Sequence, residues 1–167
     1  MTATDNTTET AAEKKYAFED FPVGRQFEFG AYPVKREDIL RFAAEFDPQP
    51  FHLDEAAAER SLFKGLSASG WHTCAMVMRM TYDHLLSDST SLGSPGLESL
   101  KWTQPVRPGD TLRVRFTVLE ARVMKSRPHV GLVRARWQAL NQRDEVVLDM
   151  EGYGMYGLRA PAAPPAA

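Results

Sequence analysis

One stretch of the chain, SASGWHTCAMVMRMTYDHLL (residues 67–86), has apolar side chains on nearly every side of a helical wheel. The apolar members are Trp71, Cys74, Ala75, Met76, Val77, Met78 and Met80. A helix that is apolar around most of its circumference has to be buried on most sides. The rest of the chain therefore has to supply a surface that covers this helix.

Three later runs supply such a surface, because apolar and polar residues alternate in them with a period of two. The apolar positions are Leu112, Val114, Phe116 and Val118, then Val133, Ala135, Trp137 and Ala139, and then Val146, Leu148 and Met150. Charged residues lie between them, which is typical of antiparallel strands with one solvated face. Helices first and strands later predict an α+β layer plan. A sheet wrapped around the apolar helix satisfies both patterns, and so do other α+β arrangements.

The segments before the apolar helix predict one strand and two shorter helices. Residues 25–34 alternate as a short strand after a turn, and residues 35–47 have apolar positions three and four apart, which indicates an amphipathic helix. Pro48 ends that helix. A further helix is expected to begin near Asp54, whose carboxylate suits an N-cap, and to end at Lys64–Gly65.

Length and composition indicate one domain. The chain has 167 residues, of which 43% are hydrophobic, and this suffices for one sizeable core. The two ends carry too little apolar surface or periodicity to join that core. We therefore expect tails at residues 1–15 and 160–167 and a folded domain at residues 16–159.

Charge and cysteine content exclude several classes of protein. Lys and Arg total 20 against 22 for Asp and Glu, so no overall field marks the chain for nucleic acid or an anionic membrane. The single cysteine, Cys74, excludes an internal disulfide framework and fits a reducing compartment. Arg79 interrupts the most apolar run before it could span a bilayer, and no targeting segment is visible. We expect a cytoplasmic protein.

The segment FDPQPFHLD (residues 46–54) places two prolines between an aspartate and a histidine. Pro48 and Pro50 each fix their own φ, and they push Asp47 and Gln49 away from the α region. The chain is expected to leave the preceding helix in an extended conformation. Asp47 and His52 would then be carried on a rigid bracket.

The run DPQPFH (residues 47–52) resembles the D-x-N-P-x-H signature of the MaoC-like, R-specific enoyl-CoA hydratase family. Three further stretches resemble the family pattern in the same order: REDILRFAAEF, GLSASG (residues 65–70) and QPVRPGDTL (residues 104–112). The resemblance covers residues 18–157 and implies a hotdog fold, an antiparallel sheet wrapped around a buried central helix.

The resemblance also implies a reaction, the reversible hydration of a 2-enoyl-CoA to a 3-hydroxyacyl-CoA by a hydro-lyase. Asp47 and His52 would share one water and act as acid and base. Gly70, at the start of the buried helix, would stabilise the enolate oxygen through its backbone N–H. No cofactor is expected beyond the coenzyme A of the acyl-CoA substrate, and the family implies at least a homodimer.

Three departures from the family pattern concern the substrate pocket. Gln49 stands where asparagine is most common, Phe51 replaces a smaller aliphatic residue, and Ser69 and Trp71 lie in an ASGW stretch where many members have AHGM. We take these four residues as candidates for substrate binding, with Ser69 also a candidate cap of the buried helix. Acyl chain length, stereochemistry and pathway do not follow from the sequence.

Two other functions stay open: a hotdog thioesterase, against which the Asp–His spacing argues, and a non-catalytic acyl-CoA binding subunit. His72 is expected to be a core histidine with a satisfied ring, and Cys74 an inert packing group. No motif supports a metal site. Candidate partners for coenzyme A phosphates are Lys64, Lys101, Arg107 and Lys125, and the sequence does not choose among them.

Overall fold

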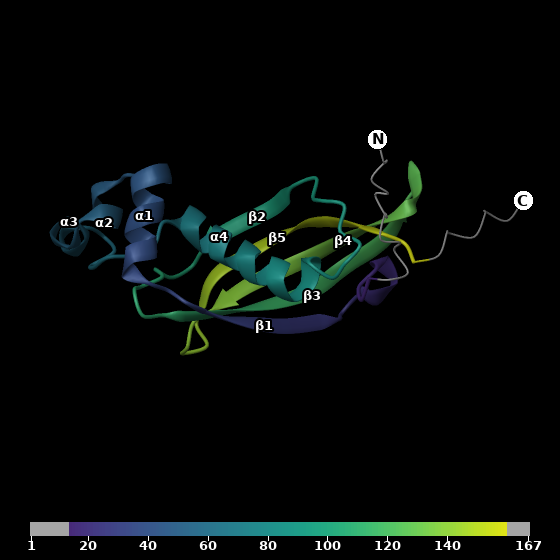
Figure 1. Cartoon of the computed structure of the whole chain (residues 1–167), viewed down its shortest axis with the longest axis horizontal. Helices are drawn as coiled ribbons and strands as arrows, with labels where there is room; N and C mark the ends of the chain where they lie inside the picture. The colour runs from purple at the N-terminus through teal and green to yellow at the C-terminus, as the bar shows by residue number, and fades with distance from the viewer. Residues whose placement is uncertain (1–13, 160–167) are drawn as a thin grey trace, which may run out of the picture.

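The computed structural model describes residues 14–159. The tails predicted at residues 1–15 and 160–167 lie outside these residues, except for Lys14 and Lys15. The backbone N–H of Lys15 donates to the Asp88 carboxylate at 3.2 Å. A five-stranded antiparallel sheet forms one layer, and one long helix, α4, lies along its face (Figure 1). The predicted hotdog arrangement, a sheet around a central helix, is confirmed.

The sheet is built from strands that are far apart in sequence. Its strands are β1 (Gln26–Pro33), β2 (Leu97–Trp102), β3 (Thr111–Met124), β4 (Arg127–Leu140) and β5 (Val146–Gly157), in the order β1-β3-β4-β5-β2. The three alternating runs form β3, β4 and β5 at its centre. Their predicted inward positions are buried or half-buried, as the period of two requires.

Strand β2 was not predicted from the sequence. It pairs with β5 at the edge of the sheet, with Leu100 opposite Met150 and Trp102 opposite Leu148. Five of its six residues are exposed in this chain, so no buried face imposes an apolar alternation on the sequence. This strand is therefore defined by its pairing with β5 and not by a local pattern of apolar residues.

Among residues 14–159, four α-helices lie between β1 and β2 in the sequence. They are α1 (Arg36–Phe46), α2 (Pro50–Leu53), α3 (Glu55–Arg60) and α4 (Gly70–Thr81), and α4 continues into a π-helical turn over Tyr82–Leu86. Asp54 caps α3 as predicted, since its side chain accepts from Ala57 N–H at 2.7 Å. The predicted end at Lys64 is wrong, because Ser61 already has extended backbone and its hydroxyl bonds Ala58 O.

Helix α4 is buried on one side and exposed on the other. Met76, Val77 and Met80 pack in the main core against the sheet. Trp71 and Met78 are 60% and 54% exposed in this single chain. Burial on most sides, as the all-round apolar pattern predicts, is therefore incomplete within one copy of the chain.

Candidate active site

Asp47 lies at the point where α1 ends. Its backbone N–H still donates to Ala43 O, but its own φ of −150° and ψ of 68° leave the helix. Gln49 is extended, as the two prolines predict, and the extended stretch then stops. Pro50 is the first residue of α2, where the absent N–H would have had no helical acceptor. The predicted extended bracket is therefore wrong beyond Gln49, because His52 is carried on a helical turn.

The His52 ring is held by a backbone carbonyl. Its Nδ1 lies 2.8 Å from Ser67 O, and the side chain is almost fully buried. A carbonyl oxygen can only accept, so this contact places a proton on Nδ1. Nε2 then faces Asp47 Oδ2 at 3.6 Å, too far for a direct hydrogen bond.

Both carboxylate oxygens of Asp47 accept hydrogen bonds from uncharged donors. Ser69 Oγ donates to Oδ2 at 2.7 Å, and Gln49 Nε2 donates to Oδ1 at 2.7 Å. The bond from Ser69 is the main cause that lowers the pKa of Asp47, with smaller contributions from Gln49 and from the nearby His52 ring, while burial opposes them. Asp47 is therefore held as a carboxylate at neutral pH.

Gly70 begins helix α4 directly beside this pair. As the first helical residue it has a backbone N–H without an acceptor inside the helix. The Trp102 indole lies across it, and Nε1 donates to Gly70 O at 2.9 Å. A Cβ at position 70 would come within 2.5 Å of the indole ring, so only glycine fits here.

A pocket of about 360 Å³ joins these groups. Its wall includes six of the seven predicted site residues: Asp47, Gln49, Phe51, His52, Gly70 and Trp71. The seventh, Ser69, is buried beneath it and acts on Asp47 through its hydroxyl. The structure therefore brings all seven predicted residues to one place.

Several residues of the pocket wall do not follow from the sequence, and Ser67 and Trp102 matter most among them. Ser67 orients His52 through its backbone carbonyl, and a backbone group leaves no signal in the residue type. Trp102 lines the pocket from β2, a strand that the sequence did not reveal. Trp102 is in edge-to-face contact with Trp71 at 5.4 Å, and this aromatic pair is the only indication of its role. The pair can be recognised only once the fold is known.

His72 departs from the prediction of a satisfied core histidine. The ring is buried and stacks on Phe42 at 4.7 Å, but Nδ1 has no hydrogen-bond partner among residues 14–159. Burial lowers the pKa of His72, and the charge of Asp38 partly opposes this shift. The ring is therefore held neutral, and an unpaired polar atom remains in the packing between α1 and α4. Burial also raises the pKa of the Cys74 thiol, in keeping with its predicted inert role.

Within residues 14–159, no three His, Cys, Asp or Glu side chains lie close enough together to hold a metal ion. None of the helices described there has both the length and the apolar character needed to cross a membrane.

Comparison with known sequences gives one family. The model of the MaoC like domain matches residues 19–137. The uncharacterized protein YdeM of Bacillus subtilis (strain 168) is 29% identical over 136 residues, which are 80% of this chain and 93% of YdeM. The (R)-specific enoyl-CoA hydratase of Rhodospirillum rubrum is 31% identical over 106 residues, 60% of this chain and 68% of that protein.

Solved structures agree with the sequence comparison. The MaoC-like dehydratase from Rhodospirillum rubrum superposes with a TM-score of 0.78 at 43% identity, over 86% of this chain and 98% of that one. The unliganded R-hydratase PhaJ1 from Pseudomonas aeruginosa gives a TM-score of 0.69 at 27% identity, over 90% and 95% of the two chains.

Proposed function

This chain belongs to the MaoC-like domain family, and on that premise we propose that it reversibly adds water to a 2-enoyl-CoA to give a 3-hydroxyacyl-CoA. The observation that supports the proposal most is the facing pair of Asp47 Oδ2 and His52 Nε2, 3.6 Å apart in a pocket wall. Relatives named as R-hydratases support the same reaction class.

The water is activated between these two acceptors. With the proton on Nδ1, neutral His52 offers a lone pair at Nε2, and Asp47 offers a carboxylate oxygen beside it. One water donates a hydrogen to each. His52 takes a proton as the water oxygen attacks Cβ, and ionised Asp47 stabilises the imidazolium that forms. His52 then returns that proton to Cα, which balances the addition of H and OH across the double bond.

The enolate oxygen of the thioester is stabilised at the start of α4. Gly70 offers a free backbone N–H there, and the positive end of the helix dipole favours negative charge at the same point. Donors fixed in advance where charge develops are among the largest contributions to catalysis. Coenzyme A enters as part of the substrate, and no further cofactor takes part.

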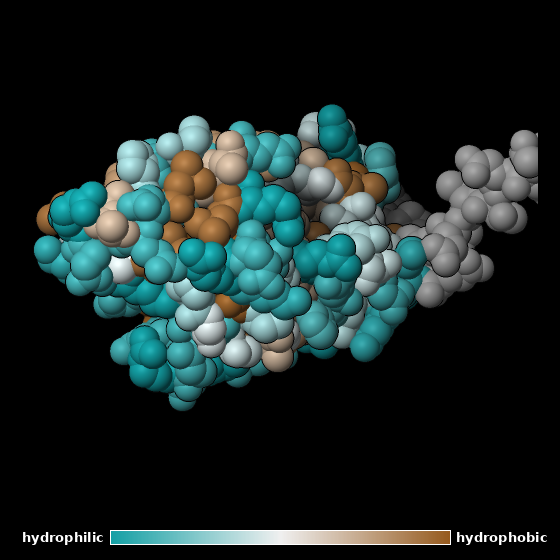
Figure 2. Space-filling model, turned by 60° about the vertical axis from the view of Figure 1, so that its left-hand side comes forward, coloured by the Kyte–Doolittle hydropathy of each residue, from teal (hydrophilic) through white to brown (hydrophobic). Residues whose placement is uncertain are grey.

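A homodimer completes the proposal. The exposed face of α4 presents Trp71 and Met78, the π-helical turn that follows adds Tyr82, and strand β2 adds exposed Leu97 and Trp102. Figure 2 shows a large hydrophobic patch, with smaller hydrophobic areas elsewhere on a mostly hydrophilic face. An exposed edge strand next to an apolar surface favours pairing with a second copy. Sedimentation of the purified protein tests this, and a monomer at micromolar concentration would contradict it.

Loss of enoyl-thioester absorbance, with the product identified by mass, tests the reaction. A panel of linear and branched 2-enoyl-CoAs is compared across the wild type, Asp47→Asn and His52→Ala. We expect each variant to lose activity by about 10²–10⁴-fold, the usual contribution of a positioned acid or base.

Two exposed residues serve as matched controls, Asp83→Asn and His129→Ala, and both should keep full activity. Release of free coenzyme A would replace the proposal with a thioesterase. Binding of acyl-CoA without any reaction would replace it with a binding role.

A further inference from the structure

Arg107 holds the loop on which the site depends, although its side chain does not line the pocket. Its guanidinium donates from Nη1 to Gly65 O at 2.6 Å and to Leu66 O at 3.2 Å. Nη2 donates to Phe63 O. Three carbonyls of one loop therefore converge on a single side chain from a distant part of the sequence.

The clamped loop leads directly into the catalytic groups. Ser67, the next residue, supplies the carbonyl that accepts from His52 Nδ1. Two residues later Ser69 donates to Asp47, and Gly70 follows with its free N–H. We propose, resting on the function proposed above, that Arg107 is a positioning residue that fixes the Ser67 carbonyl and thereby the orientation and tautomer of His52.

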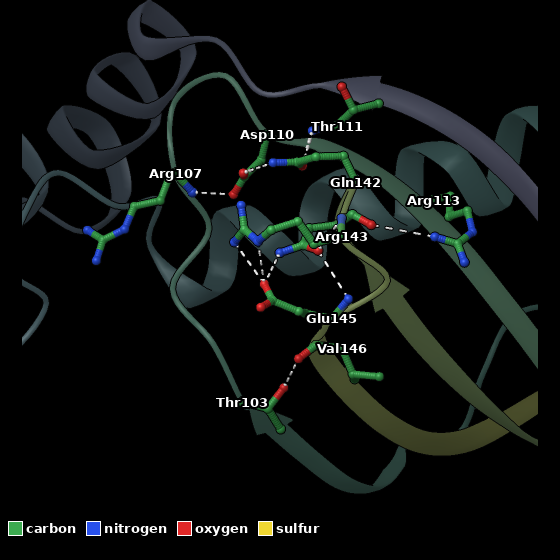
Figure 3. Close-up of polar contacts among 10 residues, drawn as sticks. Thr103, Arg107, Asp110, Thr111, Arg113, Gln142, Arg143, Glu145 and Val146 are labelled. Carbon is green, nitrogen blue, oxygen red and sulfur yellow. Dashed lines mark hydrogen bonds and ion pairs between the residues drawn. The ribbon is translucent and has the colours of Figure 1, made fainter.

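The backbone of Arg107 is itself held by a network of hydrogen bonds (Figure 3). Its N–H donates to Asp110 Oδ2 at 2.8 Å, and the other oxygen of buried Asp110 accepts from Gln142 Nε2 at 2.9 Å. Gln142 Oε1 in turn accepts from Thr111 N–H at 3.1 Å. In Figure 3 the guanidinium points away from this network. Through these bonds Arg107 joins the turn between β4 and β5 (residues 141–145) to the loop before α4.

A guanidinium suits this task better than any other side chain. Its planar fork offers five donors in fixed directions, whereas a lysine offers a single flexible ammonium. Among residues 14–159 no carboxylate forms an ion pair with Arg107, so carbonyl oxygens are its observed partners. The neighbouring bond from Ala68 N–H to Val106 O, 2.9 Å long, adds a second anchor to the same loop.

A competing role for Arg107 is direct binding of a coenzyme A phosphate, and the substrate can be chosen to separate the two. The same enoyl group is assayed as a coenzyme A thioester and as a pantetheine thioester, which lacks the nucleotide phosphates. A phosphate ligand matters only for the first substrate. A positioning residue matters equally for both.

The test compares Arg107→Gln and Arg107→Lys with Arg36→Gln, a control that removes an exposed arginine paired with Glu55. We expect kcat to fall by about 100-fold in Arg107→Gln with both thioesters, a loss that misplacing a catalytic group by about 1 Å can cause. KM should change far less. A loss confined to KM and to coenzyme A thioesters would overturn the proposal.

Chemical rescue distinguishes the specific loss of the guanidinium from a general loosening of the loop. Ethylguanidinium at millimolar concentration should restore at least a tenth of kcat to Arg107→Ala, because the side chain borders an open cleft with Glu59 and Lys64. Ethylammonium should not. Equal restoration by both cations, or by neither in a variant that folds normally, would contradict the clamp.

The His52 ring provides a readout that does not require activity. Nitrogen NMR of the wild type should show the Nδ1-protonated tautomer, and Arg107→Gln should show a mixture of both tautomers. An unchanged ring spectrum in Arg107→Gln would overturn the positioning role even if hydration is found. If the wild type hydrates no enoyl thioester but the tautomer shifts, the proposed function fails and the clamp stands.

Discussion

Strand β3 and the segment 47–70 lie in the same molecule, yet they are stabilised in different ways. In β3 one kind of contact repeats, since alternate residues from Leu112 to Val118 are all buried against the core. In the segment 47–70 each contact occurs once: Ser67 O to His52, Ser69 Oγ to Asp47, and Arg107 to the loop carbonyls.

This difference separates stability from activity. Apolar burial is non-directional and distributed, so a change in β3 alters the free energy of unfolding and leaves the geometry of the site intact. A hydrogen bond is directional, so the loss of one in the segment 47–70 should displace the catalytic group that it orients. Substitutions in the two regions should therefore be distinguished by which quantity they change.

The largest change in stability is expected in the sheet. Phe116 is buried and packs in edge-to-face contact with Trp137 at 4.9 Å. Phe116→Ala should lower the free energy of unfolding by about 3–5 kcal/mol, the usual cost of such a cavity. Urea denaturation measures this loss, and the kcat of the remaining folded enzyme should match the wild type. A lower kcat per folded molecule would contradict the separation.

Ser69 provides the converse case. Hydrogen bonds to charged groups contribute about 1.5–3 kcal/mol, so Ser69→Ala should lower kcat by roughly 10–100-fold. Ser69 also caps α4 as predicted, since its Oγ accepts from Trp71 N–H at 3.3 Å, and loss of this cap should cost only about 1 kcal/mol of stability. Ser69→Thr keeps a hydroxyl and should retain most activity, whereas equal losses in both variants would argue against the hydrogen bond.

The same variant changes a titration. With its main stabilising donor removed, the pKa of Asp47 should rise toward the ordinary value of about 3.9. A carboxyl group whose pKa is lower in the folded state than in the unfolded state stabilises the protein at pH values above its unfolded-state pKa. This stabilisation disappears as the pH falls through the folded-state pKa. Ser69→Ala should therefore lose less stability on acidification below pH ~4 than the wild type does. Carboxyl NMR titration measures the shift directly.

His72 should make the packing between α1 and α4 sensitive to mild acid. Because burial lowers its pKa in the folded state, the unfolded chain binds the proton more readily, and stability falls as the pH drops below about 6.5. His72→Phe removes the unpaired nitrogen and should gain about 1 kcal/mol, with the larger gain at pH 5.5. Denaturation at pH 5.5 and 8 tests this, and an equal gain at both values would exclude the titration.

The smallest effect is expected on the solvated face of the sheet. Arg115 Nε lies 2.6 Å from Glu28 across β1 and β3, and both side chains are partly exposed. Exposed pairs of this kind contribute about 0–1 kcal/mol, so Arg115→Gln should be nearly silent in stability and activity. Denaturation at low and high salt checks the result, since screening should abolish what difference remains.

The contrast between these regions also explains what the sequence could predict. In β3, β4 and β5 apolar residues recur at every second position because every second side chain is buried. The central strands and their inward faces could therefore be predicted. Strand β2 is not buried on one face in this chain and left no such record. The predicted extended stretch ends at Pro50 because the fixed φ of proline is compatible both with extended backbone and with the first turn of a helix.

The residues of the site followed from their types and spacing, but their supports did not. Asp47 and His52 carry groups suited to acid and base chemistry, and the structure brings them together. Ser67 acts through its carbonyl, which every residue has. Arg107 acts from 41–44 residues away in the sequence, and its three partners are also carbonyls. Contacts to backbone carbonyls depend on the fold, whereas the chemical roles of side chains can be predicted from the sequence.

The close approach of Trp102 to Gly70 restricts how this pocket can evolve. A side chain at position 70 would collide with the indole, so position 70 cannot change while Trp102 stays. The reverse order is open, because a smaller residue at position 102 collides with nothing and first enlarges the pocket wall. Of these two positions, 102 has to change before 70, so laboratory evolution of substrate range that involves this wall of the pocket should begin at Trp102.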